Sequence, residues 1–267
     1  MDELVSELVG RVQVLTLSRE EALNAFDNAL YRGLATLLQT AAADPAVAAV
    51  VLTGRGRAFS AGQDMSEMAA IGQDVGGSAE ATGAGAEAAF PVLLDALEVF
   101  DKPLIAAVNG LGVGLGFTIL AHCDLVVMAD DARLRAPFCP LGVAPEAASS
   151  VLFPDRMGWQ RAAWVLLSGE WVDAPQALEM GIAWKVVPRD EVMTTAMDAA
   201  ATIARWPIPS LVATKRAMLV GRADRVRAAR QTEGDAFRAL IGSPGNIEAV
   251  TAFLERREPD FTGIDGA

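Results

Sequence analysis

Two continuous apolar runs, each followed at once by a loop of small residues, constrain the fold of this chain most strongly. The runs cover residues 47–52 and 103–108 (PLIAAV). An apolar run without alternation is typical of a strand that is covered on both faces. The loops that follow, residues 53–68 (TGRGRAFSAGQDMSEM) and 109–116 (NGLGVGLG), each lead into a helical pattern. We therefore expect an α/β protein in which glycine-bearing loops leave the ends of buried strands.

The chain before the first run has the pattern of a hairpin followed by a helix. Residues 3–9 and 11–17 alternate apolar and polar positions, which predicts a half-buried β hairpin. Leucines at helical spacing predict a helix over residues 27–43, with Asn24 and Asp27 as candidate caps. This order gives one β-β-α unit that leads into a buried strand.

A looser copy of the same order accompanies the second run. Residues 115–121 have a helical pattern, and residues 125–128 have the pattern of another buried strand. Between the two runs, residues 72–85 (GQDVGGSAEATGAG) are small, polar and rich in glycine. We expect this segment to be a mobile loop of the kind that often serves as a lid.

The chain after residue 187 is expected to be helical to its end. The amphipathic segments cover residues 192–204, 210–220, 223–240 and 247–257. We therefore predict a core that binds ligand and carries out catalysis over residues 1–190. Residues 191–267 are predicted to form a helical extension that packs on this core or on a neighbouring subunit.

The composition is typical of a folded protein and excludes several classes of partner. The chain has 267 residues, of which 52% are hydrophobic and 21% are charged, enough for a large core. Its net charge of −12 argues against nucleic acid and anionic membrane surfaces, because both attract basic proteins. The N-terminus is acidic, and no apolar stretch approaches the roughly 18 to 20 residues of a membrane span. We expect a cytoplasmic protein.

Common catalytic motifs are absent from the sequence. His122 is the only histidine, no G-x-S-x-G occurs, and the two cysteines lack the spacing of a zinc site, so neither a nucleophilic triad nor a metal centre is expected. The glycines of residues 109–116 do not fit G-x-G-x-x-G. We expect His122 to have a packing or capping role. The two loops offer backbone N–H groups at helix N-termini, and donors from two loops are a common way to stabilise an oxyanion.

Several linked segments resemble the crotonase (enoyl-CoA hydratase/isomerase) superfamily. They are REEALNAF, GRAFSAGQDMSEM, DKPLIAAVNGLGVGLGFTILAHCDLVVMADDARL, LGVAPEAASS and SGEWVDAPQALEMGIAWKVVP, in the order and spacing of that superfamily. The resemblance implies a crotonase-like (ClpP/crotonase) spiral of repeated β-β-α units with a helical C-terminal trimerisation region. It also implies an acyl-CoA substrate, no separate cofactor, since coenzyme A is part of the substrate, and a homotrimer or dimer of trimers.

The resemblance also implies which residues form the site. The thioester oxygen would accept hydrogen bonds from the backbone N–H groups of Gln63 and Leu115. The implied contacts of coenzyme A and substrate are Ala22, Ser60, Ala61, Gly62, Asp64, Gly114, Gly116 and Phe138. Candidate contacts of the CoA phosphates are Arg19, Arg55 and Arg57, for which a solvated surface role is the alternative. Ser66 occupies the position where relatives often carry a phosphate-binding lysine.

The position of the catalytic carboxylate distinguishes the reactions of the superfamily. Where its hydratases carry two glutamates, this chain has Thr118 and Phe138, so ordinary hydration lacks its acid and base. Residues 135–150 (RAPFCPLGVAPEAASS) resemble the Δ3,Δ2-enoyl-CoA isomerases, whose single catalytic glutamate matches Glu146. The local alternative for Glu146 is a first-turn glutamate after Pro145, which the helix dipole favours.

The resemblance therefore implies an enoyl-CoA isomerase with one glutamate base, in which apolar neighbours raise the pKa of Glu146 and a helix N-terminus opposes that rise. Two kinds of alternative stay open. One is another acyl-CoA reaction of the superfamily, either hydration or hydrolysis of the CoA ester. The other is an acyl-CoA binder without catalytic activity.

Overall fold

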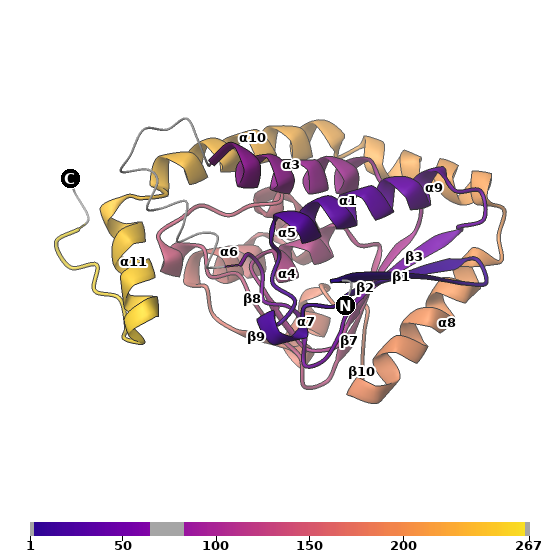
Figure 1. Ribbon diagram of the computed structural model, residues 1–267, viewed down its shortest axis with the longest axis horizontal. Helices are drawn as coiled ribbons and strands as arrows, with labels where there is room; N and C mark the ends of the chain where they lie inside the picture. Colours follow the sequence, from indigo (N-terminus) through magenta and orange to yellow (C-terminus); the bar gives the residue numbers. More distant parts are fainter. Residues whose placement is uncertain (1–2, 65–82, 265–267) are drawn as a thin grey trace.

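The computed structural model describes residues 3–64 and 83–264, and for residues 83–88 it describes the backbone alone. Two sheets form the centre of the protein (Figure 1). The six-stranded sheet has the order β1 (Leu4–Val9), β2 (Val12–Leu17), β3 (Ala49–Gly54), β5 (Leu104–Val108), β7 (Leu125–Ala129) and β10 (Lys185–Val187). The four-stranded sheet has the order β4 (Ala58–Ser60), β6 (Leu111–Val113), β8 (Arg133–Arg135) and β9 (Val172–Asp173).

The chain alternates between these two sheets. The long strands β3, β5 and β7 are parallel neighbours in the larger sheet, and each is followed by a short strand of the smaller sheet, namely β4, β6 and β8. Each pair of strands thus adds one step to a spiral, and Gly62, just after β4, lies beside Val113 and Gly114 at the end of β6. The α/β spiral expected from the sequence is confirmed.

Helices cover both faces of the larger sheet. They are α1 (Asn28–Ala43), α3 (Gly83–Val99), α4 (Leu115–Thr118), α5 (Ser149–Met157), α6 (Trp159–Ser168), α7 (Ala174–Met180), α8 (Val192–Ala204), α9 (Ile208–Val220), α10 (Ala223–Leu240) and α11 (Pro244–Glu255). Short 3-10 turns are η1 (Glu20–Ala22), η2 (Ile119–His122), η3 (Cys139–Leu141) and η4 (Arg189–Glu191). In Figure 1, α1 and α3 lie above the strands and α8 lies below them, while α10 runs beside α3. This two-sided cover explains why β5 is buried at every position.

The first helix of the predicted tail packs directly on the sheet. Four residues of α8, spaced by four, are buried against β3, β5 and β7; they are Val192, Ala196, Ala200 and Ala204. Three of them are alanines, which let the helix lie close to the strands. The division of the chain at residue 190 stays a prediction.

Local sequence signals set most element boundaries. The predicted hairpin is confirmed, with Leu4 opposite Leu17 in an antiparallel pair, but burial does not alternate along β1, whose last four residues are exposed. Asp27 caps α1, since its side chain accepts the N–H of Leu30 at 2.8 Å. The prediction that Asn24 caps this helix is wrong: Asn24 is fully buried, has φ of 57°, and donates to the carbonyls at both ends of the β3–β4 turn.

Two other predicted segments differ in detail. The helix predicted over residues 115–121 is α4 followed by the tighter turn η2. Within the segment predicted as a loop over residues 72–85, residues 72–82 lie outside the described part of the chain, and residues 83–85 begin α3.

No helix within residues 3–64 and 83–264 combines the length and hydropathy that crossing a bilayer requires.

The buried Asn24 side chain generates a first prediction. Asn24→Ala removes the hydrogen bonds to the carbonyls of Arg55 and Ala58, at 2.9 and 2.8 Å, and leaves an alanine in a left-handed conformation. We expect a loss of about 2–3 kcal/mol in the free energy of unfolding, measured by urea denaturation. Asn24→Gly loses the same bonds without the conformational strain and should cost less. Equal stability of the wild type and both variants would contradict this role.

Candidate active site

A cavity of about 760 Å³ opens between α1, α3, α10 and the segment before α5. Its apolar wall includes Tyr31, Phe90, Leu94 and Phe237, and the rings of Tyr31 and Phe90 meet edge to face at 5.5 Å. Two residues predicted for the site, Gln63 and Glu146, also line it. The cavity therefore joins an apolar surface, large enough for an acyl group, to the end of β4 and to one candidate carboxylate.

The loop after β4 turns one backbone N–H away from its neighbour Phe26. The N–H of Phe26 donates to the Gly62 carbonyl at 2.7 Å, and the N–H of Asp64 donates to the Phe26 carbonyl at 2.9 Å. This parallel bridge leaves Gln63, between them, with its own N–H directed away from Phe26. Gly62 has φ of 86°, and a Cβ there would lie 2.6 Å from the carbonyl oxygen of Val113 at the end of β6. The two loops thus meet backbone to backbone.

The second loop enters α4 through Gly114, which has φ of 52°. The N–H groups of Phe117 and Thr118 donate to the Gly114 carbonyl, as in any first helical turn, so the N–H of Leu115 has no partner within the helix. A Cβ on Gly116 would lie 2.2 Å from the carbonyl oxygen of Ser60, so only glycine lets α4 lie this close to β4.

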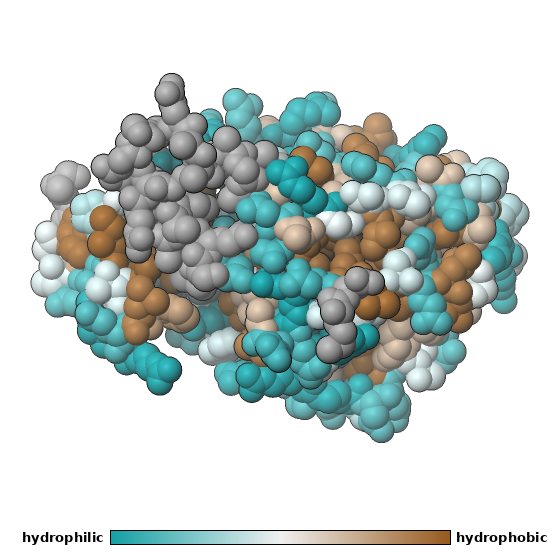
Figure 2. Space-filling view, viewed as in Figure 1, coloured by the Kyte–Doolittle hydropathy of each residue, from teal (hydrophilic) through white to brown (hydrophobic). Residues whose placement is uncertain are grey.

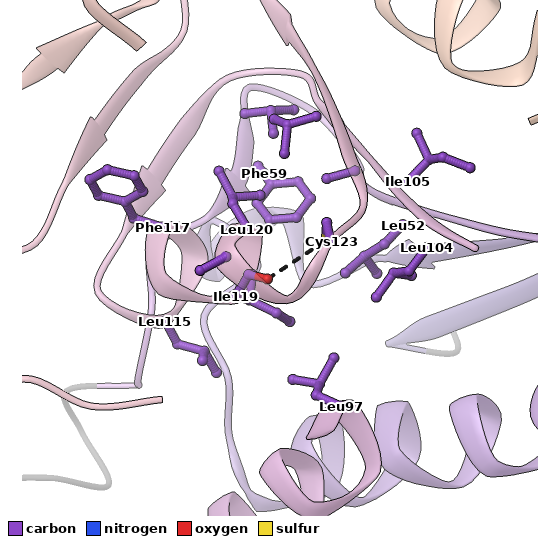
Figure 3. Packing of buried hydrophobic residues seen from close by; sticks show 14 of the residues in the cluster. Leu52, Phe59, Leu97, Leu104, Ile105, Leu115, Phe117, Ile119, Leu120 and Cys123 are labelled. Atoms are coloured by element: carbon purple, nitrogen blue, oxygen red, sulfur yellow. Dashed lines mark hydrogen bonds between the residues drawn. The ribbon is translucent and has the colours of Figure 1, made fainter. Parts of the chain in front are cut away.

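Core packing fixes the helix that carries this N–H. Figure 3 shows Leu120 lying beside Phe59, while Phe117 projects from the opposite side of α4, where its ring contacts that of Phe153 at 4.8 Å; Ile119 belongs to the same core cluster. All five side chains are fully buried. The start of α4 is therefore held rigidly against the β4 loop.

The two loops present unpaired N–H groups at one corner of the protein. Gly62 Cα lies 3.9 Å from the position of a Cβ on Gly114. Across the part of the chain that the structure describes, no acceptor takes the N–H of Gln63 or of Leu115. Two such donors from rigid loops can stabilise negative charge that develops on one oxygen atom.

Glu146 is half-buried, and its open side faces the cavity. The Thr118 hydroxyl, fully buried on α4, donates to Glu146 Oε1 at 3.1 Å. Burial raises the pKa of Glu146 to about 8; the hydrogen bond from Thr118 opposes this rise, and the charge of Glu233 adds to it. A carboxylate with this pKa is a stronger base than a solvated glutamate.

The other carboxylates of the cavity already have partners. Asp95 and Glu98 of α3 pair with Arg230 of α10 at 2.7 and 2.6 Å. Glu233, also on α10, accepts two backbone N–H groups. Among the described residues of the cavity wall, Glu146 is therefore the carboxylate without a cation or a backbone donor.

His122 supports the segment that carries Glu146. Its side chain is 3% exposed, and burial lowers the pKa of the imidazole to about 4, so the ring is neutral near pH 7. Nε2 lies 2.9 Å from the carbonyl oxygen of Ala147, which requires the tautomer with hydrogen on Nε2. The histidine thus fixes the residue after Glu146 and does not face the cavity.

Comparisons with known proteins agree with this geometry. A sequence profile described as enoyl-CoA hydratase/isomerase matches residues 7–264. The 2,3-dehydroadipyl-CoA hydratase of Escherichia coli (strain K12) is 35% identical over 98% of this chain and 100% of its own length. The 1,2-epoxyphenylacetyl-CoA isomerase of the same organism is 33% identical over 98% and 99%. The crystal structure of an enoyl-CoA hydratase/isomerase from Pseudoalteromonas atlantica T6c matches at a TM-score of 0.87, with 33% identity, covering 97% and 100%.

The chain belongs to the enoyl-CoA hydratase/isomerase family. This family is the crotonase superfamily that the sequence motifs indicated. The chemistry of this family acts on acyl-CoA thioesters. Two unpaired N–H groups beside one carboxylate, Glu146, are compatible with such a substrate.

Arg19 has a different environment from the one predicted for a CoA phosphate contact. Its guanidinium forms ion pairs with Glu3, Asp27 and Asp64 at 3.2, 3.3 and 3.1 Å, and its side chain is 15% exposed. Three carboxylates surround this one cation, so it holds the hairpin, α1 and the β4 loop together and is not open to an anion here. Asp64 is committed to the same cluster.

The other candidate phosphate contacts lie on the β3–β4 turn. Arg55 and Arg57 are exposed, and the side chain of Asn109 fixes the turn between them by donating to the Gly56 carbonyl at 2.8 Å. Ser66 lies outside the described residues.

The remaining predicted contacts lie near the two loops, with one exception. Ala22 ends η1, and the Ala61 N–H donates to the carbonyl of its neighbour Leu23 at 2.9 Å. The Ser60 hydroxyl donates to the Asn24 carbonyl at 2.8 Å. Phe138 is different, since it is 5% exposed and does not line the cavity among the described residues. The structure thus places the phenyl ring of Phe138 in the core.

The contribution of α10 to the cavity was missed at the sequence level. Arg230 and Glu233 are charged residues on an amphipathic helix, which usually means a solvated face. The available signal was spacing: both lie on the same stripe as Val226 and Phe237, three or four residues apart.

Within the described residues, no group of three or more histidine, cysteine, aspartate or glutamate side chains is arranged to hold a metal ion.

The contact of Gly116 with β4 generates a second prediction. Gly116→Ala places a methyl group against the Ser60 carbonyl, and α4 must move away from β4. We expect a loss of about 1–3 kcal/mol and a lower midpoint of thermal unfolding. Gly221→Ala is the matched control, because a Cβ there has nothing within 4 Å and the φ of −68° suits alanine. Equal midpoints for the two variants would contradict the close approach.

Proposed function

We propose that this protein is a Δ3,Δ2-enoyl-CoA isomerase, which moves a carbon–carbon double bond by a 1,3-proton shift on an acyl-CoA thioester. The observation that supports this most directly is Glu146, the one carboxylate among the described residues of the cavity wall without a cation or a backbone donor, whose pKa burial raises to about 8. An isomerase of this type needs one base, which removes and returns the same proton. A hydratase needs a second acid–base group to activate water.

The proposed reaction starts at the thioester carbonyl. Its oxygen accepts hydrogen bonds from the N–H groups of Gln63 and Leu115, which makes the C2 protons of a 3-enoyl-CoA more acidic. The Glu146 carboxylate takes one C2 proton, and the electron pair of that C–H bond spreads over C2 to C4 and the carbonyl oxygen. Protonated Glu146 then gives the proton to C4, and the double bond lies between C2 and C3. No water is consumed and no group is released.

Thr118 favours isomerisation over hydration. Hydratases of the superfamily carry a glutamate at this position, whereas Thr118 donates its hydroxyl hydrogen to Glu146 at 3.1 Å. A glutamate in its place would set two carboxyl groups side by side, a different acid–base arrangement. Relatives named as hydratases and as isomerases both occur, including enoyl-CoA delta isomerase 2 of Rattus norvegicus, 31% identical over 93% of this chain and 62% of its own length.

The proposed substrate is an acyl-CoA whose acyl group lies in the cavity. Coenzyme A is part of this substrate, and we propose no separate cofactor. Its proposed contacts are the backbone and side chains near the two loops, namely Ala22, Ser60, Ala61, Gly62, Gly114 and Gly116, with Arg55 and Arg57 available to phosphate. We place the reaction in the cytoplasm on the sequence grounds given above.

Replacing the base gives the third prediction. Glu146→Gln keeps the shape of the side chain but cannot accept the C2 proton. Conversion of a 3-enoyl-CoA should therefore fall about 10²–10⁴-fold, while acyl-CoA binding survives. Because the base acts when ionised, kcat/KM of the wild type should rise with pH up to about 8 and then level off. The measurement is steady-state isomerisation over a panel of chain lengths, with binding followed by calorimetry.

Glu179→Gln serves as the matched control, because Glu179 is an exposed carboxylate paired with Arg161 on the surface. Near-wild-type turnover by Glu146→Gln would contradict the mechanism. Fast hydration of crotonyl-CoA by the wild type would identify a hydratase, and release of free CoA would identify a hydrolase. Tight acyl-CoA binding without solvent deuterium appearing at C2 would identify a binder without catalytic activity.

We also propose a homotrimer or a dimer of trimers. Figure 2 shows apolar surface over α11, where Ile247, Phe253 and Leu254 are 57%, 57% and 67% exposed. On α6, Trp159, Trp164 and Leu167 are exposed as well. Apolar residues in such numbers on two helices are typical of surfaces that a second copy covers.

The fourth prediction is therefore a solution mass of three or six times the 28.0 kDa of the chain. Light scattering coupled to size exclusion measures it. Trp159→Glu with Leu167→Glu on α6 should lower the mass, since a charge buried in an apolar interface is costly. A monomeric wild type at micromolar concentration would refute the proposed assembly.

A further inference from the structure

The backbone next to Glu146 has an unusual conformation. Ala147 and Ala148 both lie in the left-handed region, with φ of 58° and 56°, although neither is glycine. Each such residue costs about 1–2 kcal/mol relative to the right-handed region. A strained turn of this kind persists only where its surroundings hold it in place.

A carboxylate from α10 holds this turn. Glu233 Oε2 accepts the N–H of Ala148 at 2.7 Å, and Glu233 Oε1 accepts the N–H of Ser150 at 2.9 Å. Both oxygens are thus used on one short segment of backbone, 83 to 85 residues away in the sequence. On the other side of the turn, His122 binds the Ala147 carbonyl at 2.9 Å. The segment that carries Glu146 is held from two directions.

The position of Glu233 is costly unless these bonds form. Glu233 is 5% exposed, and burial raises the pKa of its carboxyl, while the hydrogen bonds from Ser150 and Ala148 oppose that rise. Arg230, one turn earlier on α10, pairs with Asp95 and Glu98 of α3. A buried carboxylate whose oxygens bind backbone N–H groups is more than a packing residue, since an apolar side chain would fill the same space at lower cost.

We propose that Glu233 is a positioning residue for Glu146: by binding the N–H groups of Ala148 and Ser150, it fixes the left-handed turn that aims the catalytic carboxylate into the cavity. This proposal deepens the proposed isomerase function and rests on it. Glu233 acts through the backbone and need not contact the substrate. The helix α10 thereby belongs to the catalytic apparatus as well as to the cavity wall.

The positioning is shared with Thr118. The hydroxyl of Thr118 binds the carboxyl end of Glu146, and Glu233 fixes the backbone from which that side chain extends. Loss of the backbone anchor should therefore displace the carboxylate without removing its hydroxyl partner. Small displacements of a base reduce turnover strongly, since a misplacement of about 1 Å can cost about 100-fold.

The fifth prediction concerns Glu233→Gln. Its amide nitrogen would face one of the two N–H donors, so one bond is lost and the turn relaxes. We expect kcat for a 3-enoyl-CoA to fall about 10- to 100-fold with KM changed less than about threefold. Removing the negative charge should also move the midpoint of the kcat/KM profile to lower pH, since that charge opposes ionisation of Glu146. Asp235→Asn, an exposed carboxylate on the same helix, is the matched control.

A rescue experiment separates positioning from folding. In the Glu233→Gln background, Ala148→Gly should restore a measurable part of kcat, because glycine takes a positive φ without strain. Should Glu233→Gln fail to fold, Glu233→Asp keeps the charge but is one methylene too short to reach both N–H groups, and the same loss of kcat is expected. Unchanged kcat and unchanged pH midpoint in a folded variant would overturn the proposal, and so would the absence of rescue.

A readout without turnover distinguishes this proposal from the proposed reaction. Hydrogen exchange of a peptide that covers residues 147–151 should speed up in Glu233→Gln and stay unchanged in Asp235→Asn. If the wild type isomerises no 3-enoyl-CoA but this exchange pattern holds, the reaction is wrong and the anchor stands. If turnover by the wild type is present but exchange is unaffected by Glu233→Gln, the anchor is wrong.

Discussion

The close backbone contact between β4 and α4 determines where everything else in the site can lie. Ser60 and Gly116 approach so closely that a single methyl group would not fit between them. The same absence of side chains at Gly62 and Gly114 brings the unpaired N–H groups of the two loops to one corner. These loops meet because β4 and β6 are neighbours in the smaller sheet and both run in the same direction. The parallel pairing of these short strands thus brings two separate chain segments together at the proposed oxyanion site.

Local patterns in the sequence predicted the elements well where packing repeats with the period of the element. Two of the C-terminal helices, α8 and α10, begin and end at the predicted residues; buried residues recur every four positions in α8 and lie seven positions apart in α10, both of which are helical spacings. The hairpin was equally readable from alternation. Predicted helix boundaries differ from the observed ones where a capping residue sets the start of the helix. The last helix was predicted from residue 247, whereas α11 starts at Pro244, because the side chain of Ser243 accepts the N–H of Asn246.

The site could be predicted only in part from the sequence, because the environment of its charged residues depends on partners that are far away in the chain. Arg19 looks like a phosphate ligand in the sequence, yet three carboxylates from separate segments surround it. Arg230 and Glu233 look like solvated helix residues, yet their partners on α3 and near α5 lie more than eighty residues away. No local pattern shows such pairings. Motifs could indicate Glu146 and the two loops, since the chemistry proposed there depends on backbone N–H groups and one carboxyl group.

The raised pKa of Glu146 has a consequence for how a ligand enters. Near pH 7, most molecules carry this side chain as a neutral acid, so Glu146 itself places no charge on the cavity wall at rest. An acyl chain can then settle against it without stripping water from an ion, which would be costly. In the proposed reaction, entry of the acyl group and ionisation of Glu146 are therefore separate events, and only the second requires the loss of a proton.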